Sequence, residues 1–545
     1  MVGQRFFLSL SCSVLCAGLA QAQVGSAVQE RWIGEGLYGF TGALDSNDFF
    51  GESMASLGDL DGNGVNDLAV GAEGDDDGGS GRGAVWILFL NADGSVASQT
   101  KISQTSGGFT GALLDGSRFG RRVAALGDVD GDGVADLATT SGLPQRLWIL
   151  FLNRDGTVRA HGEIPFSDPV FGVGSLTVDF LEGGLDGLGD VNGDGVPDLA
   201  WGAPEDDDGD EDAGAVWIVH LNAAGGALSA QKIAQGSGGF IDDLQEDGYF
   251  GSTVIGLGDV DGNGTPDLGV KERYASVVLQ YPGKLWILFL DASEQVIGTH
   301  TLTTNDFDAS WNNGTTTAGI GHEFDTLGDL DGDGIEELAM GLYAFRSQGG
   351  FVIAFLAADG SVRKRLLAGS GSGGVSLHQG GAALGSGIAA LGDLDGDGTL
   401  ELAVSDPYLD LNSPSEGSVF LVSLDTSAVR NGSGLNPLTL GESADPALGQ
   451  LWSASLDCSG HASGLAILSG WNQKIEGNFL PAGEVLVVGT RLFQFVAPHA
   501  GGPVVLGTPV PNDLVLLNLA FSTQGLCSGA PGLRLSNALD VLVGR

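Results

Sequence analysis

The sequence is poor in basic residues and has no long apolar run beyond its first 22 residues. It contains 23 Lys and Arg against 69 Asp and Glu, so its formal net charge is −46. Such a charge repels nucleic acid and anionic membrane surfaces, and we expect no nucleic-acid partner. Because a membrane-spanning helix needs about 20 apolar residues in succession, we also expect no membrane span.

Recognisable catalytic motifs are absent as well. The seven His residues are scattered along the chain, and neither HExxH nor Gly-x-Ser-x-Gly occurs. Carboxylates abound, but no residue stands out as a nucleophile or a general base. We therefore predict that the protein is not an enzyme and has no catalytic residues.

Cysteine is scarce, and its positions relate to export. Cys12 and Cys16 lie in residues 1–22, which have a positive start at Arg5, an apolar stretch and a small-residue cleavage site. We predict that this segment is a signal peptide and that the protein is secreted, extracellular or at the cell surface. The remaining pair, Cys458 and Cys527, would form one disulfide in an oxidising compartment or stay as two buried thiols.

Glycine, in contrast, is abundant at 93 residues, and 42% of all residues are hydrophobic. This combination favours a packed fold with many tight turns over disorder. One string, Leu-Gly-Asp-x-Asp/Asn-Gly-Asp/Asn-Gly, recurs every 62 to 70 residues, which indicates a repeat architecture. Its first Asp stands at Asp59, Asp128, Asp190, Asp259, Asp329 and Asp393.

A second, apolar string follows each copy of the first. It reads AVWILFLN around Trp86 and LWILFLN around Trp148, and it degrades in the last two copies, from Phe351 and Val419. Such strings are typical of strands, and no segment of comparable length has a convincing helical period. Four strands per repeat make a propeller blade, so the predicted fold class is all-β, a six-bladed β-propeller. In the first repeat the predicted strands lie near Glu52–Leu57, Asp67–Gly71, Ala84–Asn91 and Val96–Ser103.

The two ends of the repeat region predict how the ring closes. Val28–Phe50 resembles Ala97–Phe119 and shares its GFTGAL core, so it reads as an outermost strand with no blade before it. The sixth repeat ends after its third strand, near Asp425. We therefore expect the N-terminal strand to complete the last blade, which leaves no open edge. A seventh, degenerate blade drawn from the C-terminal region is the alternative.

The predicted domain organisation follows from these limits. A signal peptide covers residues 1–22, and the propeller covers residues 23–426, with its N-terminal strand closing the last blade. From residue 427 to residue 545 the repeat stops, and short apolar and alternating stretches indicate a small β-sandwich-like domain.

The Asp-rich strings have the composition of a cation-binding loop. Oxygen-bearing side chains stand at loop positions 1, 3, 5 and 9 with Gly between them, and hard oxygen donors in this number suit Ca²⁺. An EF-hand is excluded because Val70 stands where that loop needs a bidentate Glu, while Asp- and Gly-rich turns without metal remain an alternative. We predict about six structural calcium ions. Their ligands are Asp59, Asp61, Asn63 and Asp67; Asp128, Asp130, Asp132 and Asp136; Asp190, Asn192, Asp194 and Asp198; Asp259, Asp261, Asn263 and Asp267; Asp329, Asp331, Asp333 and Glu337; Asp393, Asp395, Asp397 and Glu401.

The order Phe-Gly, acidic loop, Gly-Ala-Pro resembles the FG-GAP repeats of integrin α-subunit propellers. Phe-Gly precedes the loop at Phe50, Phe119 and Phe250 and weakens in the other repeats, and Gly202-Ala203-Pro204 is intact in the third repeat. The resemblance covers roughly residues 28–426. It implies calcium at the positions above, a structural role for that calcium, and ligand recognition on one face of the ring.

Two further features have more than one interpretation. Acidic runs follow the second strand at residues 75–77 and 205–212, and they predict solvated loops, further calcium or a cationic partner. The repeated Trp residues are predicted to lie in the core between blades rather than to form a carbohydrate-stacking platform.

The leading hypothesis for function is a secreted, calcium-binding scaffold for adhesion or for binding an extracellular protein or glycan. The alternative is a propeller-based extracellular enzyme, of polysaccharide lyase or hydrolase type.

Overall fold

The computed structural model describes residues 27–172, 183–273, 283–307, 320–321, 323–330, 333–342, 349–369, 383–395, 400–410 and 413–424, and the backbone of eight further strands between residues 427 and 542. The predicted signal peptide and Cys458 lie outside these residues, as do two of the predicted ligands, Asp331 and Asp397. Nothing described tests the disulfide, the signal peptide or the exact domain limits, which stay predictions.

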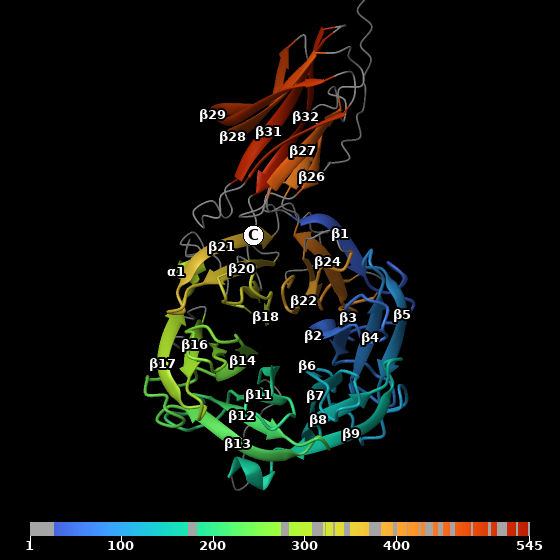
Figure 1. The fold of residues 1–545 in the computed structure, drawn as a ribbon. Helices are drawn as coiled ribbons and strands as arrows, with labels where there is room; N and C mark the ends of the chain where they lie inside the picture. Colours follow the sequence, from blue (N-terminus) through green and yellow to red (C-terminus); the bar gives the residue numbers. More distant parts are fainter. Residues whose placement is uncertain are drawn as a thin grey trace, which may run out of the picture.

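Six four-stranded antiparallel sheets surround a central axis (Figure 1), which confirms the six-bladed propeller. The strands of the first three blades are β2 (Phe50–Gly58), β3 (Asp67–Ala72), β4 (Ala84–Leu90) and β5 (Val96–Ile102); β6 (Val123–Gly127), β7 (Asp136–Gly142), β8 (Gln145–Leu152) and β9 (Val158–Pro165); β10 (Leu185–Gly189), β11 (Asp198–Ala203), β12 (Ala215–Leu221) and β13 (Ala227–Ala234). Those of the last three are β14 (Phe250–Gly256), β15 (Leu268–Glu272), β16 (Lys284–Leu290) and β17 (Val296–Leu302); β18 (Phe324–Thr326), β19 (Leu338–Gly341), β20 (Gly350–Leu356) and β21 (Val362–Gly369); β22 (Ile388–Gly392), β23 (Glu401–Asp406), β24 (Ser418–Leu424) and β1 (Ala27–Ile33).

Helical structure is limited, among the described residues, to the single turns η1 (Pro169–Phe171) and α1 (Thr304–Phe307). None of the described helices is long and apolar enough to cross a membrane. The remaining strands lie outside the ring in Figure 1 and form a five-stranded and a three-stranded sheet. They are β25 (Ser427–Arg430), β26 (Leu440–Ala444), β27 (Leu451–Asp457), β28 (Gly464–Leu480), β29 (Gly483–His499), β30 (Pro503–Pro509), β31 (Ala520–Gly529) and β32 (Gly532–Leu542).

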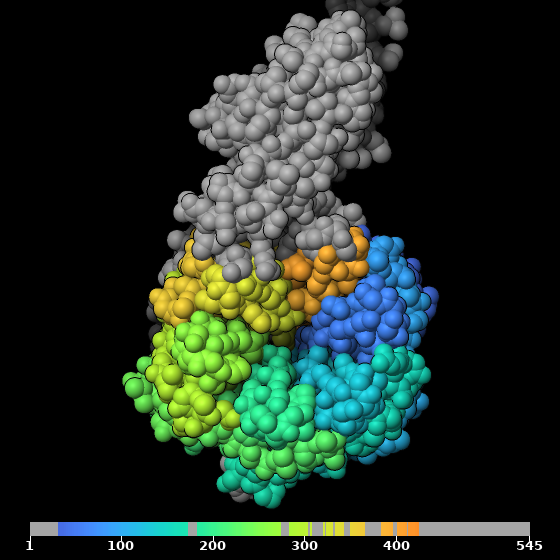
Figure 2. All heavy atoms as spheres, in the orientation of Figure 1, coloured from blue at the N-terminus to red at the C-terminus, as the bar shows by residue number. Residues whose placement is uncertain are grey.

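The ring closes through the N-terminal strand, as the sequence predicts. Strand β1 pairs antiparallel with β24, and Ile33 lies opposite Val419, so the sixth blade has the order β1-β24-β23-β22. In Figure 2 the first blade, in blue, adjoins the last, in orange, and the blades surround a central hollow. Closure pairs the edge of the sixth blade, which a three-stranded sheet would leave open.

The Phe-Gly and Gly-Ala motifs meet at the contacts between blades. A Cβ on Gly71 of blade 1 would lie 1.9 Å from the carbonyl oxygen of Gly120 in blade 2. Gly120 itself has φ +89°, and a Cβ there would lie 2.2 Å from the carbonyl oxygen of Ala84. The same pair recurs between Gly202 and Gly251 at 1.8 Å. Both motifs therefore require glycine because two backbones touch without room for a side chain.

The repeated tryptophans pack between blades, which confirms their prediction as core residues. Trp86 is 5% exposed and makes an edge-on contact with Phe40 of the preceding loop, with ring centroids 5.1 Å apart. Trp148 repeats this contact with Phe109 at 5.1 Å. Burial of large aromatic side chains dominates the energetics of such a core. Rings this deeply buried cannot stack on a carbohydrate.

The antiparallel order separates the loops into two faces. The connections between first and second strands, which hold the acidic loops, lie at one end of the blades together with the third-to-fourth turns. We call this end the metal-loop face. The second-to-third connections and the links between blades lie at the other end, which we call the opposite face.

Candidate metal centres

The backbone of each acidic loop curls around its first carboxylate. In loops 1 to 5, numbered by blade, the N–H of the Gly at position 6 donates to Oδ2 of the Asp at position 1, over 2.8–3.0 Å. In loop 1 this Gly, Gly64, has φ +88°, and a Cβ there would meet nothing within 4 Å. Glycine is needed here for the left-handed backbone rather than for space. The loop geometry is therefore built into the chain.

The carboxylate at position 9 ties the loop to the third strand. In loop 2, Asp136 is fully buried; its Oδ2 accepts from the N–H of Val129 at 3.0 Å and its Oδ1 from the N–H of Leu152 at 3.1 Å. Loops 1, 3 and 4 repeat both bonds. Burial raises the pKa of Asp136 to about 7. A cation in the loop would favour the ionised form.

Four of the loops bring three carboxylates within 4.8 Å of one another. These trios are Asp59, Asp61 and Asp67; Asp128, Asp130 and Asp136; Asp259, Asp261 and Asp267; Asp393, Asp395 and Glu401. They contain positions 1, 3 and 9 of the predicted ligand set. The described residues of loops 3 and 5 form no such trio: Asn192 stands at position 3 of loop 3, and Asp331 of loop 5 lies outside the described part of the chain.

Position 5 also shapes the loop, and in loop 2 its residue, Asp132, is not one of the three converging carboxylates. Oδ1 of the residue at position 5 accepts from the N–H of position 7 in loops 1 to 5, over 2.7–3.0 Å. The sequence pattern alone therefore does not show which side chains of the loop meet at one point and which also hydrogen-bond the loop backbone.

The oxygen donors fit a hard divalent cation. Oδ1 of Asp130 is buried and has no hydrogen-bond partner among the described residues. A buried, unpartnered carboxylate oxygen costs free energy unless a cation or proton satisfies it. The described loops offer carboxylate and amide oxygens, which suit Ca²⁺ better than zinc.

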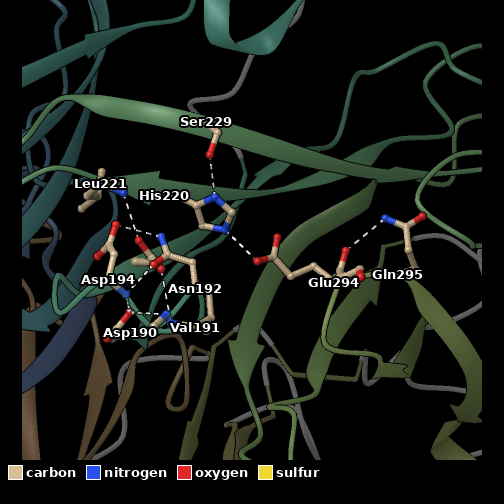
Figure 3. Close-up of polar contacts among 12 residues, drawn as sticks. Asp190, Val191, Asn192, Asp194, His220, Leu221, Ser229, Glu294 and Gln295 are labelled. Atoms are coloured by element: carbon tan, nitrogen blue, oxygen red, sulfur yellow. Dashed lines mark hydrogen bonds and ion pairs between the residues drawn. The ribbon is translucent and has the colours of Figure 1, made fainter.

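Loop 3 lies beside a polar group that spans two blades (Figure 3). The Nδ1 of His220 lies 2.7 Å from Oγ of Ser229, and its Nε2 lies 2.7 Å from Oε1 of Glu294 in the next blade. His220 takes the place of Phe89 and Phe151 in other blades, and Glu294 takes the place of Gly225 in the third-to-fourth turn. Glu294 adopts φ +58°, which Gly tolerates more easily.

This group has two chemical interpretations. A hydroxyl beside a His–carboxylate pair resembles a hydrolase triad. However, the His–Glu pair replaces the packing of a Phe against a Gly that the neighbouring blades use, where a Cβ on Gly225 would lie 3.1 Å from Phe151. We interpret it as a polar latch between blades 3 and 4.

Lysine side chains form ion pairs with the acidic runs on the opposite face. Nζ of Lys101 lies 2.6 Å from Oδ2 of Asp75, which is 2% exposed. In blade 3, Nζ of Lys232 lies 2.7 Å from Oδ1 of Asp206 and 2.6 Å from Oδ2 of Asp208. The prediction of solvated loops is therefore wrong for Asp75 and Asp206, because each is buried and paired with a lysine of the fourth strand, while neighbours such as Asp76 and Asp207 are exposed as predicted.

Sequence reasoning missed these lysines, the His220–Glu294 pair, and the ion pairs that Arg159 and Arg363 form with carboxylates of loops 2 and 5. Lys101 stands opposite Trp86 in the β4–β5 pairing, and Lys232 stands opposite Trp217 in the β12–β13 pairing. This repeated pairing of Lys with Trp is the sequence signal that could have revealed the two lysines. The His–Glu contact joins residues 74 positions apart, in different repeats, and no local pattern marks it.

A ring of six four-stranded sheets, each with an acidic loop after its first strand, defines a repeat-built β-propeller. The FG-GAP repeat family matches residues 50–88, 119–158 and 186–219, within the first three blades. The first three blades therefore carry FG-GAP repeats, and the ring is similar to the propellers of integrin α-subunits.

Integrin α-subunits match about a third of the chain at modest identity. Integrin alpha-5 of Xenopus laevis is 32% identical over 179 residues, which are 31% of this chain and 16% of that protein. Integrin alpha-PS2 of Drosophila melanogaster is 29% identical over 198 residues, or 34% and 13% of the two chains. Human integrin alpha-6 is 31% identical over 178 residues, or 30% and 13%. The matched part is thus less than a fifth of each relative.

Proposed function

We propose that this protein is a secreted, non-catalytic scaffold whose metal-loop face binds structural calcium and whose opposite face binds an extracellular protein or glycan. The observation that carries the proposal is a groove of about 480 Å³ on the opposite face. Loops of three neighbouring connections line it, including Asn47, Phe49, Asp76, Asp115 and Arg118. Loops held by a rigid ring are a common place for recognition.

One backbone conformation presents different side chains around this face. Asn47 and Phe49 have φ of +67° and +54°, and Asp247 and Tyr249 repeat the pair in blade 4 with +55° and +54°. Arg118 holds the second place in blade 2, with +51°. Non-glycine residues rarely adopt this region, so the ring holds these loops firmly. A fixed loop with a variable tip of Phe, Arg or Tyr suits a recognition surface, since these residue types are enriched at interfaces.

A ligand screen with and without calcium tests the binding role. We expect a protein or glycan that binds the full chain with calcium, and loses at least tenfold in affinity when Arg118→Ala or Phe49→Ala removes a groove side chain. Arg154→Ala is the matched control, because Arg154 is exposed on the metal-loop face. Equal losses in control and groove variants would argue against the groove as the binding site.

Calcium would occupy the six loops, held by the predicted ligands at positions 1, 3, 5 and 9. Its chemistry there is to neutralise clustered carboxylates and so to stabilise the folded ring. Removing it with a chelator should lower the melting temperature by several degrees, and adding calcium back should restore it. An unchanged melting temperature would rule out the structural role.

The enzymatic alternative rests on the Ser229–His220–Glu294 group. Incubating the protein with a panel of polysaccharides and measuring new chain ends tests it. Turnover that disappears in Ser229→Ala would replace the binding role by a hydrolytic one. No turnover in either protein supports the scaffold.

Secretion through residues 1–22, a disulfide between Cys458 and Cys527, and a separate domain over residues 427–545 belong to the same proposal. Extracellular calcium and an oxidising compartment suit a calcium-loaded ring and a disulfide. Mass spectrometry of secreted protein, with and without reduction, would detect the cleavage before Gln23 and the bond.

A further inference from the structure

At ligand position 5, one side-chain atom (Oδ1) accepts from the loop backbone, and the other (Nδ2 of Asn or Oδ2 of Asp) has a second partner. In loops 1 to 5 this second partner differs from loop to loop. In loops 1 and 4 the residue is Asn, whose Oδ1 accepts a hydrogen bond and whose Nδ2 donates one. Nδ2 of Asn63 donates to the carbonyl of Leu90 at 3.1 Å, and Nδ2 of Asn263 donates to the carbonyl of Leu290 at 2.9 Å. Both carbonyls belong to the last residue of the third strand, so the amide fastens the loop to its blade.

Loop 2 has an Asp at this position, and an arginine supplies the missing donor. Nη2 of Arg159 lies 2.7 Å from Oδ2 of Asp132 and 2.6 Å from Oδ2 of Asp130. The other oxygen of Asp130 is Oδ1, which is buried and has no hydrogen-bond partner among the described residues. The guanidinium therefore holds the outer oxygens of two predicted ligands and leaves one inner oxygen open.

Loop 5 repeats the arrangement with a second arginine. Nη2 of Arg363 lies 2.5 Å from Oδ2 of Asp333, and its Nε donates to the carbonyl of Leu356 at 2.7 Å. The guanidinium thus bridges the carboxylate to the third-strand carbonyl that an Asn would reach directly. In loop 3, Nδ2 of Asn192 donates to Oδ2 of Asp194 at 3.2 Å, and Leu228 stands where blades 2 and 5 have their arginine.

The two arginines occupy the same place in their blades. Each follows the residue that pairs with the end of the third strand, Val158 in blade 2 and Val362 in blade 5. The equivalent residues of blades 1, 3 and 4 are Ala97, Leu228 and Ile297. Arginine therefore stands at this place in loops 2 and 5, which have four acidic positions, and not in loops 1, 3 and 4, where an Asn reduces the number to three. Loop 6 differs: it has four acidic positions, but Val28 follows Ala27, which pairs with the end of its third strand.

We infer that Arg159 and Arg363 are tethered counter-charges that set the calcium affinity of loops 2 and 5 close to that of the three-carboxylate loops. This inference rests on the proposed calcium binding. Ligand charge count is one determinant of calcium affinity, and a fixed positive charge cancels part of it. The same charge relieves repulsion among the carboxylates in the metal-free loop. Both effects weaken calcium binding, so removal of the arginine should strengthen it.

Calcium-dependent hydrogen exchange of the full chain measures each loop separately. The midpoint for protection of the peptide covering residues 128–136 should move to about threefold lower free calcium in Arg159→Ala, the residue that blade 1 has. The peptide covering residues 59–67 should keep its midpoint. Without calcium, Arg159→Ala should melt about 2 °C below the wild type, because the carboxylates repel one another.

Two further variants make the test specific. Asp132→Asn combined with Arg159→Ala gives loop 2 the composition of loop 1, and its midpoint should return to the wild-type value. Arg154→Ala removes the same charge nearby, but this guanidinium contacts the carbonyl of Gly133 at 3.2 Å rather than a carboxylate, so its midpoint should stay unchanged.

Three results would overturn the counter-charge role: an unchanged or higher midpoint in Arg159→Ala, an equal shift in Arg154→Ala, or no return in the double variant. Failure of the proposed calcium binding would look different. In that case the peptide covering residues 59–67 of the wild type would gain no protection from calcium at all.

Discussion

At the scale of single residues, the acidic ligand positions divide into two kinds. In loops 1 to 4 the carboxylate at position 9 accepts two backbone hydrogen bonds and holds the loop against the third strand. The carboxylate at position 3 makes fewer backbone contacts: Oδ1 of Asp61 accepts one hydrogen bond, from the N–H of Asn63 at 2.9 Å. The carboxylates at positions 9 and 3 of the motif therefore contribute differently: the first mainly to the stability of the fold, the second mainly to the predicted calcium binding.

We expect Asp136→Ala to destabilise the metal-free protein by about 3 kcal/mol, because the N–H groups of Val129 and Leu152 lose their buried acceptor. Urea unfolding in the presence of a chelator measures this change. Asp61→Ala is the matched variant. It should leave metal-free stability within about 0.5 kcal/mol of the wild type and reduce the stabilisation by calcium. Similar losses for both variants would contradict the division.

The residue scale also marks the limit of prediction from sequence. The spacing of Asp and Asn identified the loops, because a repeat makes each position visible six times. It did not predict that position 9 is clamped by two amides, or that Arg159 contacts Asp130 and Asp132 from the fourth strand. Such contacts depend on how far a long side chain bends across a blade, and no periodicity records that.

At the scale of strands and blades, glycine contacts decide how closely neighbouring blades approach. Gly120→Ala would place a Cβ 2.2 Å from the carbonyl oxygen of Ala84 at φ +89°. We expect a loss of about 3 kcal/mol or more, seen as a lower urea midpoint. Gly236→Ala is the control, since Gly236 also has a positive φ, +76°, with nothing within 4 Å. It should cost only about 1 kcal/mol, and an equal loss would mean that backbone strain alone explains the motif.

The strands themselves were largely predictable. Those of the first blade begin and end within a few residues of their predicted limits, because short apolar runs bounded by Gly, Asn and Asp mark strands, and β3 and β4 are buried along their whole length. The β1–β24 pairing followed from the GFTGAL similarity. Contacts between blades were not predictable, since Gly71 and Gly120 lie in different repeats and meet only in the closed ring.

The polar latch between blades 3 and 4 allows a test at the same scale. His220→Phe alone should destabilise the protein by about 1–2 kcal/mol, because Glu294 would lose its partner while keeping a strained backbone. His220→Phe combined with Glu294→Gly should recover most of the loss, since it restores the Phe-on-Gly packing of the neighbouring blades. A double-mutant cycle from thermal unfolding measures the coupling, and additive effects would show that the two residues act independently.

At the scale of the whole molecule, the innermost strands place charged side chains around the axis. Glu52 of β2 is 5% exposed, and the charges of Arg121 and Arg122 act on it together with those of Glu73 and Glu323. Burial raises the pKa of Glu52 to about 7. The Glu52 side chain is buried, and loss of contact with water disfavours its ionised form.

Two more carboxylates of the innermost strands bind the next blade directly. Oδ2 of Asp186 accepts from the N–H of Gly256 at 2.8 Å, and Oδ2 of Asp325 accepts from the N–H of Ala390 at 2.7 Å. Burial raises the pKa of each to about 7 as well. These side chains stand where other blades have apolar residues such as Ile255, so the contact between blades is partly polar.

The raised pKa values predict how stability depends on pH. Between about pH 4.5, where Glu52 ionises in the unfolded chain, and about pH 7, where it ionises in the folded ring, the folded state holds a proton that the unfolded state has lost. Glu52 therefore lowers the free energy of unfolding as pH rises through this window. Below it both states are protonated and above it both are ionised, so Glu52 contributes no slope there.

Glu52→Gln isolates this contribution, because the amide has no proton to lose. In chelator, the urea midpoint of Glu52→Gln should fall less steeply than that of the wild type between pH 4.5 and pH 7, and the variant should be the more stable protein above pH 7. Asp325→Asn should act in the same direction. A wild-type stability that rises with pH across this window, or identical slopes in all three proteins, would show that these carboxylates are already ionised in the closed ring and that Arg121 and Arg122 fully compensate their burial.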